Sequence, residues 1–204
     1  MAEETTRQKI ADVALDLFSK NGYTAVSIRD ICGQVGIKES TVYYHFKNKR
    51  AIFEALLLRF ETTAQNMMNR LDQAMADMSV IGPGAMQTVS DVFFDRYLMD
   101  DFCNQFMRVM SLEKFNDEEV CRLYTKWMFD EPLRFQSRVF AELIKAGIVS
   151  STDSGYLAIR YYSPIYLYTQ RYLLSGQLTE EKKKEFRAQV DIHVFKFFME
   201  CGVQ

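Results

Sequence analysis

The N-terminal part of the chain carries apolar residues at helical spacing. Ile10, Val13, Ala14, Leu17 and Phe18 recur at intervals of three and four residues. This stripe predicts an amphipathic helix over about 5–21, and Gly22 directly after it supplies a stop. The function of such a helix would be to pack across whatever follows and fix its angle.

The next segment, about 27–46, predicts two short helices joined by a tight turn. Ser27 with Asp30 three residues later matches the capping-box pattern of a helix start. Gly36 follows the first short helix, where a residue without Cβ can take a positive φ cheaply. The apolar positions predicted to face inward are Ile28, Ile31, Val35, Ile37, Val42 and Phe46.

The second short helix then exposes an unusual set of side chains on its outer face: Lys38, Glu39, Ser40, Thr41, Tyr43 and Tyr44. Hydroxyls, phenols and a lysine on so short a helix indicate a ligand rather than solvent alone. A helix-turn-helix that inserts this face into the major groove of DNA is the function that we favour.

The rest of the chain also shows helical patterning, and no strand-like alternation appears. A long helix is predicted from about 48 to 78, and 80–84 (VIGPG) is the clearest break. Asp130-Glu131-Pro132 is predicted to open a new helix that closes at Gly147, and Thr152 or Asp153 to cap another that Pro164 should kink. The predicted helices after the break cover about 85–100, 101–115, 117–129, 130–147, 153–175 and 179–201.

Composition and charge agree with an all-α protein that contacts DNA at one end. The 204 residues include only 9 glycines and 3 prolines, and the formal net charge is −2. Residues 1–50 hold 8 Lys/Arg against 6 Asp/Glu, a net of +2, and the remainder holds 17 against 21, a net of −4. The slight cationic bias therefore lies in the part predicted to bind DNA.

Specific residues in this part resemble those of a known family. They are Ala14, Leu17 and Phe18, the Gly22-Tyr23 turn, Ser27 to Ile31, Gly36, and the block from Thr41 to Lys49. At this spacing, residues 5–64 resemble the DNA-binding domain of the TetR (tetracycline repressor-like, TetR/AcrR) family of transcriptional regulators. Cys32 stands where such motifs usually have alanine, and it is small enough for that helix contact.

The resemblance implies two domains: a helix-turn-helix DNA-binding domain over 5–64, with its motif at about 27–46, and a helical effector-binding and dimerisation domain over 65–204. By position, Lys38, Glu39, Ser40, Thr41 and Tyr44 would face the groove, while Ser27, Arg29, Tyr43, His45 and Lys49 would hold phosphates. For Tyr43 and His45 the alternative is that they merely cover the three-helix core. The Glu39 carboxylate could accept a hydrogen bond from cytosine, or it could disfavour binding to other base sequences.

The resemblance also implies a homodimer on a palindromic operator, formed by the last two long helices. Its apolar contacts would come from Tyr161, Ile165, Tyr168, Tyr172, Val190, Val194, Phe197 and Phe198, unless these residues fill the monomer core. The middle helices are rich in aromatic residues and methionine. An effector pocket for a small, largely apolar or aromatic ligand would draw on Phe94, Phe106, Met110, Trp127, Met128 and Phe135, again unless they are simply core. Ligand would then shift the protein to a state that releases DNA, as expected of a repressor.

Other functions find less support in the sequence. The histidines are two, His45 and His193, and no glycine-rich phosphate loop, Ser/His/Asp grouping or metal-spaced cluster appears, so we expect neither an enzyme nor a bound metal or cofactor. The four cysteines are widely spaced, which favours free buried thiols in a cytoplasmic protein. No signal peptide or membrane helix is expected. The alternative function is a helical ligand-binding or protein-interaction module without specific DNA binding.

Overall fold

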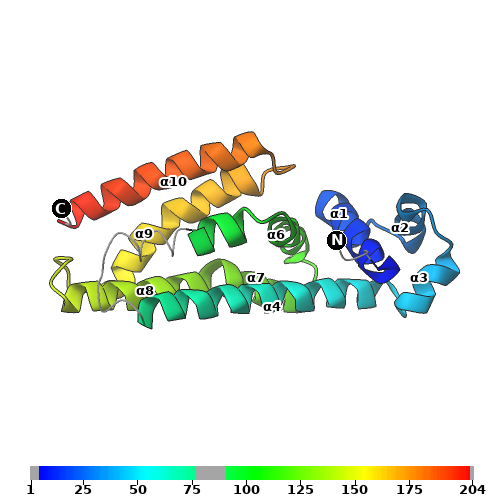
Figure 1. The fold of residues 1–204 in the computed structure, drawn as a ribbon, viewed down its shortest axis with the longest axis horizontal. Coiled ribbons are helices and arrows are strands. Elements are labelled where there is room, and N and C mark those ends of the chain that lie inside the picture. Colours follow the sequence, from blue (N-terminus) through cyan, green and yellow to red (C-terminus); the bar gives the residue numbers. More distant parts are fainter. Residues whose placement is uncertain (1–4, 77–90, 203–204) are drawn as a thin grey trace.

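The computed structural model describes residues 5–76 and 91–202. Every secondary-structure element in these ranges is helical. Figure 1 shows an elongated arrangement in which α1, α2 and α3 form one end, α4 runs along the length of the molecule, and α9 and α10 lie at the other end. The all-α prediction is confirmed for the described residues.

The N-terminal helices begin and end where the sequence predicts. Helix α1 spans Thr6–Asn21, and the Thr5 hydroxyl accepts a hydrogen bond from the Gln8 N–H at 3.3 Å. Helix α2 spans Ile28–Val35, and both bonds of the capping box between Ser27 and Asp30 are present. Gly36 ends α2 in the left-handed conformation, with φ +79°, and α3 follows over Glu39–His45. The predicted two short helices and their turn are therefore confirmed.

Helix α4 spans Lys49–Ala76 and connects the two ends of the molecule. The Asn48 side chain caps its start by accepting from the Ala51 N–H at 2.9 Å. Its buried face runs through both predicted domains and comprises Ile52, Phe53, Leu56, Leu57, Phe60, Ala64, Met67, Met68 and Leu71. The predicted domain boundary at 64/65 falls inside this helix, and α1 packs against both α4 and α6, so the two-domain division stays a prediction.

The C-terminal part combines α-helices with π-helical turns. Its elements are η1 (Asp91–Leu98, a π-helix), α6 (Asp101–Glu113), α7 (Glu118–Thr125), η2 (Lys126–Asp130, π), α8 (Glu131–Lys145), α9 (Ser154–Tyr168), η3 (Thr169–Leu173, π) and α10 (Glu180–Glu200). Asp153 caps α9 and Thr179 caps α10. The predicted break at 80–84 and the start of the helix predicted at 85 lie outside the described residues.

The helix predicted to open at Asp130-Glu131-Pro132 is present as α8, which begins at Glu131, but it is not separated from the helix before it. Asp130 has helical φ and ψ of −65° and −51° and makes no side-chain cap, so α7, η2 and α8 run on without interruption. Pro132 has no N–H to donate to the carbonyl of Met128 four residues earlier. The Tyr162 hydroxyl donates to that carbonyl at 2.9 Å instead, so the proline is accommodated inside a helix that widens there into a π turn.

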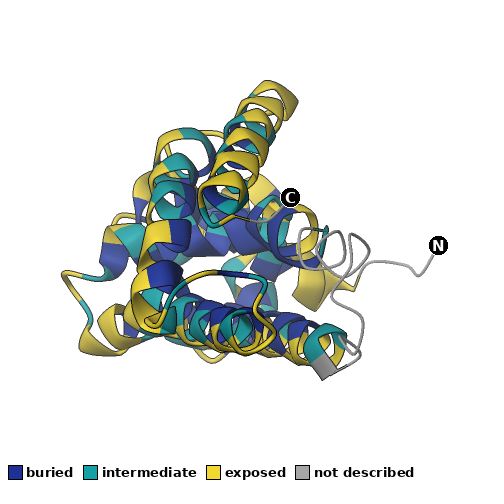
Figure 2. Cartoon of the chain, turned by 90° about the vertical axis from the view of Figure 1, so that its left-hand side faces the viewer, coloured by how far each residue is buried: buried dark blue, intermediate teal, exposed yellow. Residues whose placement is uncertain are grey.

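A single apolar core extends from Ile10 in α1 to Phe197 in α10. Figure 2 shows the buried residues on the faces that the helices turn toward one another, with exposed residues around the outside. The α8–α9 pair makes the most extensive contact, and α10 packs on α9 and η3. Packing of the N-terminal helices is thus continuous with that of the C-terminal helices.

Two glycines near the turn provide a matched test of this backbone. Gly36→Ala should lower the free energy of unfolding by about 1–2 kcal/mol, because alanine resists positive φ. Gly33→Ala should raise it by about 0.4–1 kcal/mol, because Gly33 lies inside α2 with open space around its Cα. Urea unfolding followed by circular dichroism measures both, and equal effects would contradict the assigned turn.

Candidate nucleic-acid interface

Helix α3 presents its polar face to solvent at one end of the molecule. Tyr44 is 85% exposed and Tyr43 is 51% exposed, while Val42, directly before them in the sequence, is fully buried. The Tyr44 ring contacts the His45 ring edge-on, with the two ring centroids 5.0 Å apart. So large an exposed fraction for Tyr43 argues against a role in covering the core, whereas His45 is half-buried.

The remaining groove-facing candidates surround these tyrosines. Lys38 and Ser40 are exposed, and Glu39 and Thr41 are half-buried. The Arg29 Nε donates to the Glu39 Oε1 at 3.0 Å, which connects the start of α2 to the start of α3. An exposed pair of this kind contributes little to stability, so Arg29 stays available to a phosphate.

Ser27 is engaged in the capping box. Its N–H donates to Asp30 Oδ2 at 2.7 Å and its hydroxyl donates to the same oxygen at 2.6 Å. These hydrogen bonds from Ser27 hold the pKa of Asp30 below its ordinary value. A phosphate contact by Ser27 would therefore compete with the bonds that start α2.

Lys49 differs from its predicted placement among the phosphate-binding residues. Its ammonium donates to the carbonyl oxygens of Tyr23 at 2.8 Å and Val26 at 2.7 Å, and it lies 4.3 Å from the centroid of the Tyr23 ring. Burial lowers the pKa of Lys49. Two of its three donors are thus used inside the protein, where they hold the turn between α1 and α2 against α4.

The same turn is held from the C-terminal part by a residue that sequence reasoning missed. Glu113, at the end of α6, is only 6% exposed, and its Oε1 accepts from the Tyr23 N–H at 2.9 Å. A Cβ at Gly22, whose φ is +82°, would come within 3.0 Å of that oxygen, so the turn and the carboxylate fit closely. Nothing in the local sequence of α6 distinguishes Glu113 from a surface acid.

An ion-pair network near the start of α4 also went unpredicted. Arg50 donates to Asp117 Oδ2 at 2.8 Å and to Glu119 Oε2 at 2.7 Å. The hydrogen bond from Arg50 holds the pKa of Asp117 below its ordinary value. The first two residues of α4 therefore contact the α1–α2 turn and the α6–α7 connection respectively.

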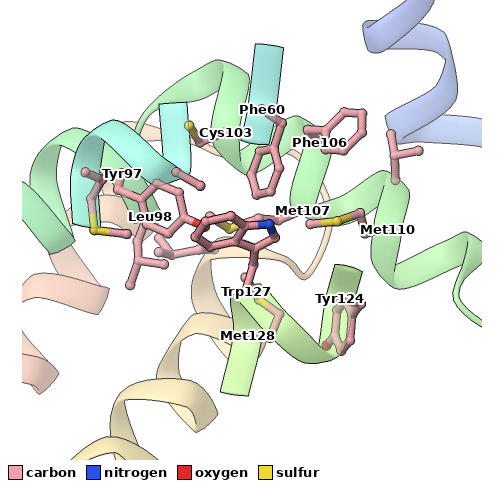
Figure 3. Close-up of a cluster of buried hydrophobic side chains, with 14 of the residues drawn as sticks. Phe60, Tyr97, Leu98, Cys103, Phe106, Met107, Met110, Tyr124, Trp127 and Met128 are labelled. Carbon is pink, nitrogen blue, oxygen red and sulfur yellow. The ribbon is translucent and has the colours of Figure 1, made fainter. Parts of the chain in front are cut away.

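All six candidate effector-binding residues are buried: Phe94, Phe106, Met110, Trp127, Met128 and Phe135. Figure 3 shows Phe106, Met110, Trp127 and Met128 in one cluster around Phe60, whereas Phe94 packs against Phe186 elsewhere. A hollow of about 180 Å³ between α4 and η1 is lined by other residues, namely Thr63, Asn66, Met67, Arg70, Val92 and Arg96. The candidate residues form closely packed core in this structure.

Half of the candidate dimer residues are buried within the single chain. Tyr161, Ile165, Val190 and Phe197 are at most 7% exposed, and Tyr161 and Phe197 pack on Phe140 of α8. They are monomer core, while Tyr168, Tyr172, Val194 and Phe198 are half-buried. Helical spacing alone could not separate these positions, because α9 and α10 also carry apolar residues on the opposite face. The large exposed residues there are Tyr156, Ile159, Leu167, Ile192, Phe195 and Met199.

Three further features of the described residues concern the cysteines, possible metal ligands and the character of the helices. Cys32 and Cys103 are buried, but Cys121 is exposed, so the prediction that all the thiols are buried is wrong. Across 5–76 and 91–202, no three His, Cys, Asp or Glu side chains form a group that could bind a metal ion. Within those ranges, none of the helices combines the length and apolar character of a membrane span.

An exposed short helix, set by a capped helix and a glycine turn within a three-helix unit, defines the helix-turn-helix class of DNA-binding proteins. Residues 10–56 match the family of bacterial regulatory proteins described as the tetR family. The region that holds the helix-turn-helix is therefore similar to the DNA-binding part of TetR-family regulators.

Two curated relatives are similar to part of the chain. The chain is 44% identical over 48 residues to the biofilm operon icaADBC HTH-type negative transcriptional regulator IcaR of Staphylococcus aureus, which is 24% of this chain and 26% of IcaR. It is 34% identical over 61 residues to the HTH-type transcriptional regulator UidR of Escherichia coli, 30% of this chain and 31% of UidR. The alignments thus span about a quarter to a third of those relatives.

Solved structures extend the similarity of fold to nearly the whole chain. The TetR family transcriptional regulator PfmR of Thermus thermophilus superposes with a TM-score of 0.63 at 17% identity, covering 91% of this chain and 97% of PfmR. SmeT, the repressor of the Stenotrophomonas maltophilia multidrug efflux pump SmeDEF, superposes with a TM-score of 0.60 at 17% identity, covering 95% and 90%. The C-terminal helices therefore share the fold of such regulators.

Lys49→Ala tests the internal role of this lysine. The loss of two hydrogen bonds from a charged donor should lower the free energy of unfolding by about 1–3 kcal/mol. Lys47→Ala is the matched control, because Lys47 is exposed, and it should change stability by less than about 0.5 kcal/mol. Thermal unfolding measures both. If both variants keep wild-type stability, Lys49 does not hold the turn.

Proposed function

We propose that the protein is a homodimeric TetR-family repressor that binds a palindromic operator and is released from it by a small, largely apolar ligand. The exposed polar face of α3 is the observation that carries this proposal. Lys38, Ser40, Tyr43 and Tyr44 all reach solvent at the end of the molecule, held on a helix whose other side is Val42. Such a face has little structural purpose without DNA.

Roles within this face follow from side-chain chemistry. Lys38 can donate to base edges, Ser40 and Thr41 can donate or accept there, and the Tyr44 ring can contact the thymine methyl group. Arg29, Tyr43 and His45 are suited to phosphate oxygens, since cations and phenols bind there without reading sequence. Glu39, paired with Arg29, would mainly orient that guanidinium.

A second copy of the chain is the partner that fits the exposed apolar face of α9 and α10. Ile159 and Leu167 of α9 and Ile192, Phe195 and Met199 of α10 are each at least half exposed. Apolar faces of this extent usually mark interaction sites. These side chains lie eight residues apart along α9 and three, four and seven residues apart along α10. This spacing suits a two-fold four-helix bundle, which would present two α3 helices to one DNA site. Half-sites would then lie about 34–36 Å apart.

Relatives support the repressor assignment and the ligand. IcaR is named a negative regulator, and SmeT is a repressor whose complex with triclosan has been solved, with a TM-score of 0.64 to this chain at 18% identity. The aromatic and methionine-rich core beside α4 supplies the corresponding apolar environment here. Ligand would favour a conformation in which the α3 helices no longer match the groove spacing.

The contacts of α4 and α6 offer a route for this coupling. Phe60 of α4 lies in the core cluster, while Lys49 at the start of the same helix holds the α1–α2 turn. Glu113 at the end of α6 holds that turn as well. Movement of either helix would shift the turn and, through Ser27, the position of the helix-turn-helix.

Tyr44→Ala should weaken binding to an operator recovered by selection from a random duplex pool. Loss of one base contact should lower the affinity roughly 10-fold, within the range of about 1–3 kcal/mol for a single base position. Stability and dimer formation should not change, because Tyr44 is 85% exposed. Fluorescence anisotropy measures the affinity. Wild-type affinity in this variant would remove Tyr44 from the interface, and failure to select any site would favour the ligand-binding module without specific DNA binding.

Phe195→Glu should convert the dimer to monomer, because it would place a charge in an apolar interface. Operator affinity should fall roughly 100-fold or more, since a monomer loses the second contact with the same DNA. Phe115→Glu is the matched control: Phe115 is 86% exposed on the α6–α7 connection, and its replacement should leave the dimer intact. Sedimentation equilibrium gives the mass of each variant. A dimeric Phe195→Glu protein would contradict the proposed interface.

A further inference from the structure

Three side-chain polar atoms in the described part of the chain are buried without a hydrogen-bond partner. They are the Tyr97 hydroxyl, the Trp127 Nε1 and the Asn104 Oδ1. An unpaired buried donor costs about 1–3 kcal/mol, so native proteins rarely keep one without a purpose. The two donors, Tyr97 and Trp127, lie in the same neighbourhood.

The ring of Phe60 packs against the rings of both donor residues. The ring centroids of Tyr97 and Trp127 are 6.1 Å and 6.4 Å from that of Phe60, which also stacks on Phe106 at 5.0 Å. Figure 3 shows all four rings in one cluster, with Met107, Met110 and Met128 around them. We call this set of seven residues the Phe60 cluster.

Both donors lie on π-helical turns. Tyr97 belongs to η1 and Trp127 to η2, and Met128 follows Trp127 on the same turn. Such turns are rare, less stable than α-helix, and frequent at functional sites. A change of η1 or η2 from π-helix to α-helix would move Tyr97 or Trp127 relative to the rest of the cluster.

Burial alone does not explain why the Tyr97 hydroxyl lacks a hydrogen-bond partner, as a comparison with Tyr162 shows. Tyr97 and Tyr162 both pack against Phe93, with ring centroids 6.0 Å and 6.4 Å from that of Phe93, and both are buried. The Tyr162 hydroxyl donates to the Met128 carbonyl at 2.9 Å, whereas the Tyr97 hydroxyl has no partner. Burial raises the pKa of Tyr97 well above its ordinary value, so its hydroxyl keeps its proton and stays a donor.

We propose that the Phe60 cluster is the closed form of the effector site, and that Tyr97 and Trp127 donate hydrogen bonds to an acceptor oxygen of a neutral, mainly aromatic effector. The proposal rests on the proposed function and specifies its ligand. No member of the cluster carries a charge, and burying an unpaired ion there would cost far more than burying a neutral acceptor. Methionine side chains can move to admit aromatic molecules of differing shape.

A ligand in this site would act directly on α4. It would have to displace Phe60, which lies on the helix whose first residue, Lys49, holds the α1–α2 turn. The site is therefore placed where occupancy changes the contact between the C-terminal helices and the helix-turn-helix.

Two probes of the same shape test the proposal: acetophenone, which has a carbonyl acceptor, and 2-phenylpropene, in which a CH₂ group replaces that oxygen. Trp127 is the one tryptophan of the chain, so its fluorescence reports on the site directly. Dissociation constants are measured without DNA for wild type, Tyr97→Phe and Tyr162→Phe. For Trp127→Phe, broadening of the probe's proton resonances replaces fluorescence.

Tyr97→Phe should weaken acetophenone binding about 3- to 10-fold and leave 2-phenylpropene binding unchanged. Trp127→Phe should likewise weaken the binding of acetophenone relative to that of 2-phenylpropene. Tyr162→Phe should preserve the ratio of the two affinities, because its hydroxyl is already occupied. The midpoint of thermal unfolding should stay the same or rise in Tyr97→Phe and fall by about 2–4 °C in Tyr162→Phe.

An acetophenone-to-phenylpropene affinity ratio that is the same in wild type, Tyr97→Phe and Trp127→Phe would overturn the proposal. So would failure of both probes to bind at their solubility limits. These outcomes are distinct from failure of the proposed function, because the titrations contain no DNA. A protein that binds the probes as expected but no operator would keep the ligand site and lose the repressor assignment.

Discussion

The structure depends on the way in which the turn between α1 and α2 is held. Its carbonyl oxygens accept from the ammonium of Lys49, and its Tyr23 N–H donates to the carboxylate of Glu113. These contacts come from two helices of different parts of the chain, α4 and α6. Because the turn leads directly into the Ser27 capping box, they fix the start of the helix-turn-helix. Hydrogen bonds to charged groups that are partly or fully buried are among the stronger ones in proteins, so this junction is stiff.

This junction connects the C-terminal helices to the helix-turn-helix. Helix α4 carries Lys49 at its start and Phe60 further along, so the same helix contacts the α1–α2 turn and the aromatic core. The core around Phe60 contains two buried donors without a hydrogen-bond partner, Tyr97 and Trp127, and such donors are unfavourable in free energy. A ligand that satisfies those donors would recover part of this free energy and could thereby stabilise a different position of α4.

The sequence predicted those features that depend on neighbouring residues. Ser27 and Asp30 formed the expected capping box, and Gly36 took the expected left-handed conformation, because both signals are local. Long-range contacts could not be predicted. The resemblance places Lys49 at a phosphate, and nothing near it in the sequence indicates that its ammonium donates to carbonyl oxygens 26 and 23 residues earlier. Tyr161 and Phe197 were assigned to a dimer because helical spacing gives two apolar faces and does not say which one α8 covers. The continuity of η2 with α8 could not be predicted either, because the Tyr162 hydroxyl that accommodates Pro132 comes from far along the chain.

Sequence-specific DNA binding is the central claim, and one titration tests it most directly. The wild-type protein is titrated by fluorescence anisotropy against the DNA upstream of its own gene, or a duplex recovered by selection, and against a scrambled duplex of equal length at several salt concentrations. The account predicts at least about 10³-fold tighter binding to the specific duplex, the lower limit for specific binders. Equal binding to both duplexes, falling steeply with salt, would show only counterion release at a cationic surface and would contradict the claim.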